Sequence, residues 1–223
     1  MKEKEQLINY LSQFISEERY NRIFEVSGNR THHVAIIVEN LYQSHNMSAV
    51  LRTAECFGVQ NVHIIENNFE YKVSKEVSMG ADKWLSMYRY HDKENNTEAC
   101  LQAVKAAGYK IVATMPAEHD CLLDDIDITE PKAFLFGTEL LGLTPQAIAM
   151  ADEFVKIPMY GFTESYNISV SVALTMMNVV QRLHHSDIHW QLSPEELLDL
   201  RLSWIKKSIK DVESIIERYK QSY

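Results

Sequence analysis

Residues 155–173, VKIPMYGFTESYNISVSVA, contain an apolar start, a polar middle and an apolar end, which predicts a strand, a loop and a helix. Pro158 lacks a backbone N–H and stiffens the exit from the strand, while Gly161 permits a turn that other residues resist. Asn167 is a strong candidate for the helix cap, because its side chain can accept a hydrogen bond from a free N–H. The loop therefore gathers Ser165, Asn167 and free backbone amides in one small volume, which suits a polar small molecule.

Two further segments join an apolar stretch to polar residues. Residues 134–143, FLFGTELLGL, read as a strand that ends in a turn around Glu139 with a glycine on each side. Residues 45–54, HNMSAVLRTA, have a polar start and continue as a helix that carries Arg52. These three segments contain the residues on which our functional expectations depend.

Strands and helices alternate around these segments, which predicts an α/β fold with a mostly parallel sheet and helices on both faces. Glycines 58 and 108 are expected just past two helix ends. A polar connection at 66–83 is expected to be mobile and to face the substrate, and the acidic run 120–127 is expected to be a solvated turn. The expected strands cover 33–38, 62–65, 84–90, 109–114 and 133–136, and the expected helices cover 46–57, 95–107, a short stretch from Thr144, and a long one from Asn167.

The three segments, in this order and near these spacings, resemble the motifs of the SpoU/TrmH class of RNA ribose 2′-O-methyltransferases in the SPOUT superfamily. The resemblance runs from about Val34 to Arg182. It implies a methyltransferase domain at 31–185 that ends in a deep C-terminal trefoil knot, whose turns form the cofactor pocket. It also implies S-adenosyl-L-methionine as the cofactor and a homodimer whose site is completed across the interface. Helical extensions at 1–30 and 186–223 fit the tRNA-modifying branch.

Carried onto this chain, the resemblance implies two sets of site residues. Phe136 and Ile157 fit a core role equally well. Tyr166 stands where the family usually has leucine, a difference that bears on the subtype of substrate and not on the reaction. The catalytic set is Arg52, Asn46, Glu139, Ser165 and Asn167, and the cofactor set is Thr114, Met115, Phe136, Gly137, Glu139, Ile157, Met159, Tyr166 and Asn167.

Arg52 is the residue that we expect to matter most for catalysis. A guanidinium stays protonated at ordinary pH, so a simple general base is excluded. Arg52 is instead expected to hold an RNA phosphate and stabilise the developing alkoxide. Asn46 is expected to cap its helix or touch RNA, Glu139 to orient Arg52 or a loop amide, and Ser165 to bind phosphate. His45 and Arg182 are weaker candidates for which we expect surface roles.

Composition and the absence of certain motifs disfavour several other classes of protein. The 223 residues are 46% hydrophobic, with no apolar run near the ~20 residues that a membrane span needs. An odd number of widely spaced cysteines favours a reducing cytoplasm over a disulfide framework. No metal is expected, because the histidines and cysteines lack metal-ligand spacing. The Gly-x-Gly-x-x-Gly, P-loop and Gly-x-Ser-x-Gly patterns are absent.

The expected activity is 2′-O-methylation of a ribose in structured RNA, with a guanosine in the tRNA D-loop as the preferred target. A formal net charge of −9 disfavours a purely electrostatic RNA binder and requires a local basic face. Two alternatives stay open, namely an rRNA ribose methyltransferase and a non-catalytic RNA-binding protein on the same fold.

Overall fold

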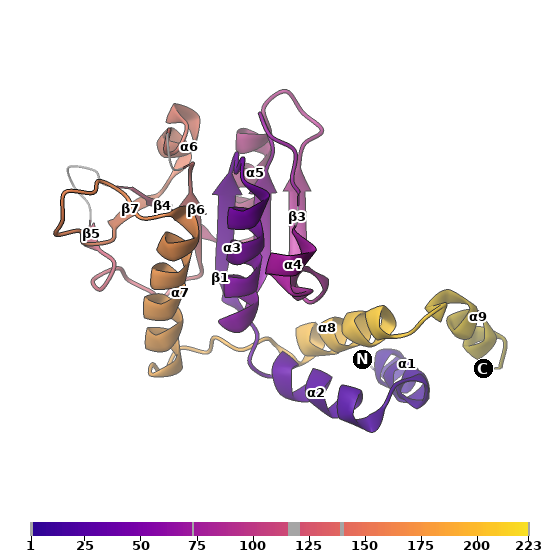
Figure 1. The fold of residues 1–223 in the computed structure, drawn as a ribbon. Coiled ribbons are helices and arrows are strands. Elements are labelled where there is room, and N and C mark those ends of the chain that lie inside the picture. The colour runs from indigo at the N-terminus through magenta and orange to yellow at the C-terminus, as the bar shows by residue number, and fades with distance from the viewer. Residues whose placement is uncertain (1, 73, 116–120, 139–140, 223) are drawn as a thin grey trace. The chain divides into compact units, whose positions relative to one another are not determined.

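The structure, a computed structural model, describes residues 2–72, 74–115, 121–138 and 141–222. In these residues seven strands form one sheet in the order β3-β2-β1-β6-β4-β7-β5, and every neighbouring pair is parallel (Figure 1). The predicted parallel α/β sheet is therefore confirmed. The strands are β1 (Thr31–Glu39), β2 (Val59–Ile65), β3 (Ser86–Tyr90), β4 (Lys110–Thr114), β5 (Cys121–Leu122), β6 (Lys132–Phe136) and β7 (Glu153–Lys156).

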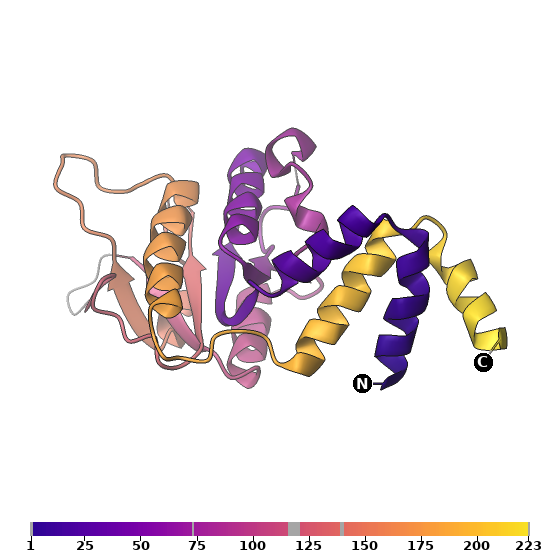
Figure 2. The same ribbon diagram turned by 90° about the horizontal axis from the view of Figure 1, so that it is seen from below.

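Helices cover both faces of the sheet, as predicted. Alternation along β1 sends Ile36 into the core shared with α3 (Ser44–Cys56) and α7 (Ile168–His184), whereas Ile37 faces α5 (Asn96–Ala106) and α6 (Pro145–Met150). Figure 2 shows α3 and α7 on the same side of the sheet, where they also pack on each other. Fully burying a side chain such as Ile36 contributes ~1.5–3 kcal/mol.

Helix ends follow local sequence signals. The Asn167 side chain accepts a hydrogen bond from Ser169 N at 2.9 Å and caps α7, as predicted. Thr144 caps α6 in the same way, accepting from Ala147 N at 3.2 Å. Gly58 and Gly108 follow helices with φ of 72° and 92°, where a left-handed residue is needed. These local predictions are confirmed.

The acidic run 120–127 is a solvated turn only in part: residues 123–125 form a turn, and Asp124, Asp125 and Asp127 are exposed, as predicted. Cys121 and Leu122 form strand β5 against β7, and Leu123 and Ile126 are buried. Arg182 holds this segment, because its guanidinium donates to Leu123 O at 3.2 Å and Ile126 O at 2.6 Å. Part of the run, residue 120, lies outside the described residues. Arg182 therefore has a structural role, because it holds the backbone carbonyls of Leu123 and Ile126.

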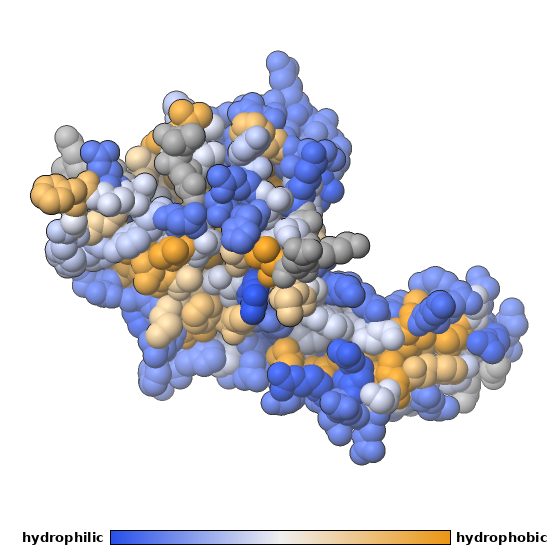
Figure 3. All heavy atoms as spheres, in the orientation of Figure 1, coloured by the Kyte–Doolittle hydropathy of each residue, from blue (hydrophilic) through white to orange (hydrophobic). Residues whose placement is uncertain are grey.

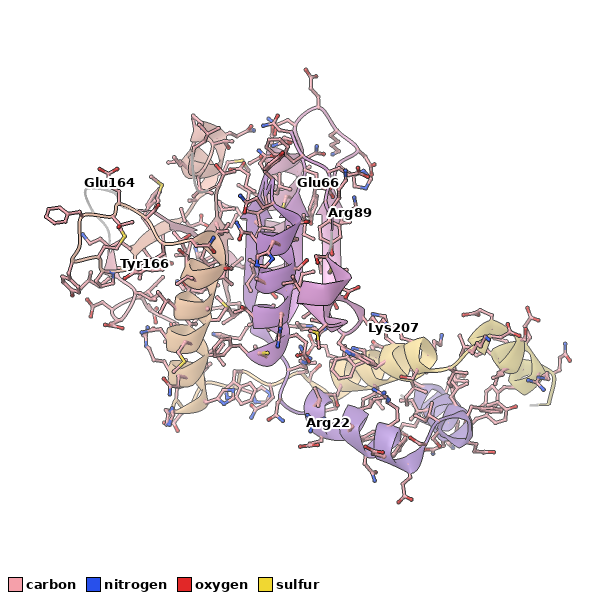
Figure 4. All side chains as sticks on the ribbon, in the orientation of Figure 1. Arg22, Glu66, Arg89, Glu164, Tyr166 and Lys207 are labelled. Carbon is pink, nitrogen blue, oxygen red and sulfur yellow. The ribbon has the colours of Figure 1, made fainter. Side chains whose placement is uncertain are left out.

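The connection at 66–83, of which residue 73 lies outside the described residues, makes specific polar contacts. Arg89 on β3 donates from Nε and Nη2 to Glu66 at 2.7 and 2.9 Å (Figure 4), and Tyr71 N donates to the same carboxylate at 2.6 Å. Burial alone would raise the pKa of Glu66, but these hydrogen bonds outweigh it and the pKa lies below its ordinary value. The segment also contains α4 (Lys75–Ser78) and a 3₁₀ turn, η2 (Ala81–Lys83).

His63 on β2 gives the fold a pH-dependent stability. It is 6% exposed, its ring stacks on Tyr88 at 4.7 Å, and burial lowers its pKa to about 4. An unfolded histidine titrates near ~6.5, so below that pH the unfolded chain takes up a proton that the folded chain refuses. We expect the free energy of unfolding to fall by ~3 kcal/mol between pH 6.5 and 4, measured by urea unfolding. A His63→Phe variant should lack this component, and an unchanged pH profile in that variant would contradict the prediction.

The terminal segments form a compact unit of their own, made of residues 1–30 and 191–223, and residues 31–190 form the other. In the terminal unit, Arg201 Nε donates to Ser27 Oγ at 2.8 Å, and its guanidinium lies over the Phe24 ring. Ser193 and Glu196 form a capping box at the start of α8. The helices of this unit are α1 (Lys2–Leu11), the 3₁₀ turn η1 (Ser12–Phe14), α2 (Glu17–Ser27), α8 (Pro194–Ser208) and α9 (Val212–Ser222).

Within the described residues, no helix has the length and apolar character needed to cross a membrane.

Candidate functional site

Three neighbouring strands end at one edge of the sheet and open into a cavity of about 180 Å³, called here the donor cavity. Register places Ala113 of β4 opposite Leu135 of β6, and Thr114 opposite Val155 of β7, so the segments after these strands start side by side. The donor cavity is lined by seven residues of the predicted cofactor set, which are Thr114, Met115, Phe136, Gly137, Ile157, Met159 and Tyr166.

The donor cavity has apolar walls and a polar mouth. Phe136, Leu143 and Ile168 are buried wall residues. Figure 4 shows Glu164 and Tyr166 on the loop that precedes α7, and Tyr166 Oη donates to Pro158 O at 3.2 Å across this loop. Such a pocket suits a ligand with a flat apolar part and a polar or charged end.

The turn after β6 closes on itself at Gly137. A Cβ at Gly137 would lie 2.3 Å from the carbonyl carbon and oxygen of Gly142, so no other residue fits. Gly142 is therefore the neighbour that requires a glycine at position 137. Gly161, in contrast, has no positive φ and no atom within 4 Å of an added Cβ, so its predicted special turn was wrong. Glu139 lies outside the described residues.

Two asparagines join α3 to α7 beside the donor cavity. Asn167 Nδ2 donates to Asn46 Oδ1 at 3.2 Å, and Asn46 is 5% exposed. Asn46 does not cap α3 as predicted, because the helix begins at Ser44 and its cap position is Gln43. Asn46 Nδ2 instead donates to Gln43 Oε1 at 3.2 Å. The structure therefore brings these two predicted residues together, although neither lines the donor cavity.

Ser165 and Arg52 lie in different surroundings. Ser165 is exposed and lines the donor cavity. Arg52 is exposed on α3, six residues after Asn46 or about 9 Å along the helix axis, and does not line the donor cavity. Its guanidinium makes no hydrogen bond or ion pair with the part of the chain that the structure describes, so it is available to an outside group.

The sequence of this chain matches known RNA methyltransferases over most of its length. Residues 33–177 match the model of the SpoU rRNA Methylase family. The chain is 38% identical to the tRNA (guanosine(18)-2′-O)-methyltransferase of Borreliella burgdorferi over 208 residues, which is 93% of this chain and 94% of that protein. The chain belongs to the SpoU methylase family.

Solved structures of the SpoU methylase family have the same fold. The crystal structure of the A. aeolicus TrmH/SpoU tRNA modifying enzyme has a TM-score of 0.78 and 26% identity, covering 87% of this chain and 98% of that one. The SpoU methyltransferase AviRb from Streptomyces viridochromogenes, in complex with the cofactor AdoMet, has a TM-score of 0.57 and 20% identity over 72% of this chain and 61% of that one.

Glu39 is a residue of this SpoU methylase that our sequence analysis did not single out. It is 1% exposed and is the last residue of β1. Its carboxylate accepts from Thr97 Oγ1 at 2.6 Å and from Thr144 Oγ1 and N at 2.8 and 2.9 Å. Glu39 thereby fixes the residue that follows the turn 137–143. An ionisable residue at the end of an apolar strand was the available signal.

Removing this acceptor should cost stability. We expect Glu39→Ala to lower the free energy of unfolding by ~2–4 kcal/mol, because the buried Thr97 hydroxyl and two donors of the half-buried Thr144 lose their partner. Urea unfolding monitored by circular dichroism measures the change. The control is Glu98→Ala on α5, an exposed glutamate that should stay within ~0.5 kcal/mol of wild type. Equal effects of the two variants would contradict a supporting role for Glu39.

Among the residues that the structure describes, no three His, Cys, Asp or Glu side chains come close enough to bind a metal ion.

Proposed function

We propose that this chain is an S-adenosyl-L-methionine-dependent tRNA (guanosine-2′-O-)-methyltransferase that modifies a guanosine in the D-loop. The observation that carries the proposal is the donor cavity, where seven residues of the predicted cofactor set meet at the ends of β4, β6 and β7. The guanosine-18 methyltransferase of B. burgdorferi, 38% identical over 93% of this chain, supports the choice of substrate.

The donor cavity fits such a cofactor. Phe136, Leu143 and Ile157 offer apolar walls for an adenine ring, and backbone groups after the three strands offer hydrogen bonds. The exposed Glu164 carboxylate at the mouth favours a positively charged ligand. When bound, S-adenosyl-L-methionine supplies an electrophilic methyl group on a sulfonium cation.

We assign Arg52 a role that needs a permanent positive charge and not a proton acceptor. We assign its guanidinium to an RNA phosphate and to the developing 2′-alkoxide, while the phosphate or a water takes the proton. Asn46 and Asn167, joined by their hydrogen bond, are assigned to holding the α3–α7 side of the acceptor site. Ser165 at the mouth is assigned to phosphate, and Glu139 keeps its proposed role in orienting Arg52 or a loop amide.

We also propose a homodimer and a trefoil knot. Val170, Leu174 and Met177 on α7 are exposed at helical spacing, and Figure 3 shows apolar side chains over α7 at the surface. A stripe of this kind is typical of an interface and supports pairing of two copies. Because Arg52 lies away from the donor cavity of its own chain, a site completed by the partner is favoured. The position of β6 between β1 and β4 is consistent with threading. Light scattering tests the dimer.

Charge is divided unequally between the two compact units. The terminal unit contains eleven Lys and Arg and eleven Asp and Glu residues, so the formal charge of −9 belongs to residues 31–190. We therefore assign most phosphate contacts to the terminal unit, whose basic residues include Arg22 and Lys207 (Figure 4). No disulfide joins Cys56, Cys100 and Cys121, which suits the cytoplasm where tRNA is modified.

One experiment tests the function. Purified protein is incubated with tritiated S-adenosyl-L-methionine and either bulk tRNA or bulk rRNA, and the methylated residue is mapped by mass spectrometry. We expect 2′-O-methylguanosine in the tRNA D-loop. Transfer to rRNA alone would favour the rRNA alternative, which the name of the family model supports. Binding of S-adenosylhomocysteine without transfer to any RNA would favour a non-catalytic protein.

A further inference from the structure

A second hollow of about 360 Å³ lies beside the donor cavity, called here the acceptor hollow. It shares Thr138 with the donor cavity and contains Asn46, the residue bonded to Asn167. Because the methyl acceptor must meet the donor at its cavity, the rest of the accepting nucleotide needs an adjoining space. The acceptor hollow is lined by Leu41, Tyr42, Gln43, Asn46, Phe69, Thr138 and Leu141.

Two aromatic side chains stand at this hollow. Tyr42 is 74% exposed and Phe69 is 40% exposed, and their ring centroids lie 4.9 Å apart at 65°. Tyr42 follows β1 and Phe69 follows β2, so both rings stand at the carboxyl edge of the sheet with the donor cavity. Aromatic rings exposed to this extent leave apolar area in water, which a stacked nucleobase would cover.

Polar groups lie across the aromatic pair. Tyr42, Gln43 and Phe69 also line a third hollow of about 560 Å³, together with His45, Asn68, Glu70 and Lys72. Amide, carboxylate and ammonium groups beside an aromatic ring match the mixed donor and acceptor edge of a purine. A purely apolar partner would find several of these groups without a match. The surroundings therefore favour a nucleotide over a purely apolar partner.

We propose that Tyr42 and Phe69 form the stacking site for the base of the accepting nucleotide, with its ribose directed past Asn46 and Thr138 to the donor cavity. The inference rests on the proposed function and deepens it. The target base leaves its neighbours in an RNA loop and stacks on the exposed aromatic pair. Tyr42 and Phe69 are thus binding residues for the acceptor, separate from those that hold the donor.

The test compares Tyr42→Ala, Phe69→Ala and Tyr42→Trp with wild type in the full-length protein. Tritiated methyl transfer to tRNA gives kcat and KM, and calorimetry with S-adenosylhomocysteine gives donor affinity. We expect each alanine variant to lower kcat/KM for tRNA by about 5- to 150-fold, the range typical of one lost base–aromatic stack. Donor affinity should stay unchanged, and Tyr42→Trp should retain transfer.

The matched control is Tyr88→Ala on β3, an exposed tyrosine whose ring is also paired, in this case with His63. It should transfer methyl groups like wild type. Alanine variants at 42 and 69 that also match wild type would overturn the stacking site alone. A changed molecular mass in light scattering, or weakened S-adenosylhomocysteine binding, would assign the rings to a subunit contact or to the donor and overturn it too. A wild type without any transfer would overturn the proposed function itself.

Discussion

Arg52→Ala should transfer methyl groups to tRNA at least about 100-fold more slowly than wild type. Its affinity for S-adenosylhomocysteine should equal that of wild type. Arg52 is exposed on α3 and lies outside the donor cavity, so truncating it leaves the cavity walls intact. What the variant loses is a permanent positive charge with a fork of N–H donors for phosphate and alkoxide. Tritiated methyl transfer measures the first quantity and calorimetry the second.

Two controls separate chemistry from helix stability. Arg52→Lys keeps the charge without the planar fork, so we expect an intermediate rate. Glu55→Ala removes a charged side chain from the same helix and should transfer normally. Loss of donor binding in Arg52→Ala would contradict the assigned role, and so would full transfer by that variant.

Local sequence signals predicted the helix starts and strand ends that surround the donor cavity. Asn167 was recognised as the cap of α7, and a short helix was expected to start at Thr144, because signals at a helix start are satisfied within three residues of themselves. The ends of β4 and β6 were predicted because apolar runs of strand length are bounded by polar or glycine residues. The seven cavity residues came from motif resemblance, which local patterns do not supply.

Long-range pairing explains what sequence reasoning missed. Strand β5 has two residues and exists only through its pairing with β7, more than thirty positions later. Glu39 depends on donors from Thr97 and Thr144, which are 58 and 105 positions away. Neither partnership leaves a periodic trace in the chain.

Glycine was the least readable residue type. The sequence does not show why a glycine is present. It can be required by a positive φ, by a close neighbour, or by neither. Gly142, with φ of 66°, is of the first kind and Gly137 is of the second. Gly161 has neither feature. The prediction that Gly161 permits a turn other residues resist was therefore wrong. Only the structure distinguishes the three positions.

Gly137→Ala should weaken binding at the donor cavity. The new Cβ would lie 2.3 Å from the Gly142 carbonyl carbon and 2.5 Å from Leu143 N, and both are backbone atoms that cannot rotate away. The turn must open, which breaks the hydrogen bonds between Thr138 and Gly142 at 3.0 and 2.9 Å. Strain of ~1–3 kcal/mol or more follows, and we expect S-adenosylhomocysteine affinity to fall at least about tenfold.

Gly161→Ala is the matched control, since nothing lies within 4 Å of its added Cβ and its loop borders the same cavity. It should bind S-adenosylhomocysteine like wild type in calorimetry and unfold at the same urea concentration. If Gly137→Ala does not fold, Gly142→Ala tests the same turn more gently, because a left-handed alanine costs ~1–2 kcal/mol without a clash. If both turn variants bind S-adenosylhomocysteine as tightly as wild type, the closed turn does not shape the donor cavity. Strain in the turn would then leave the binding site unchanged.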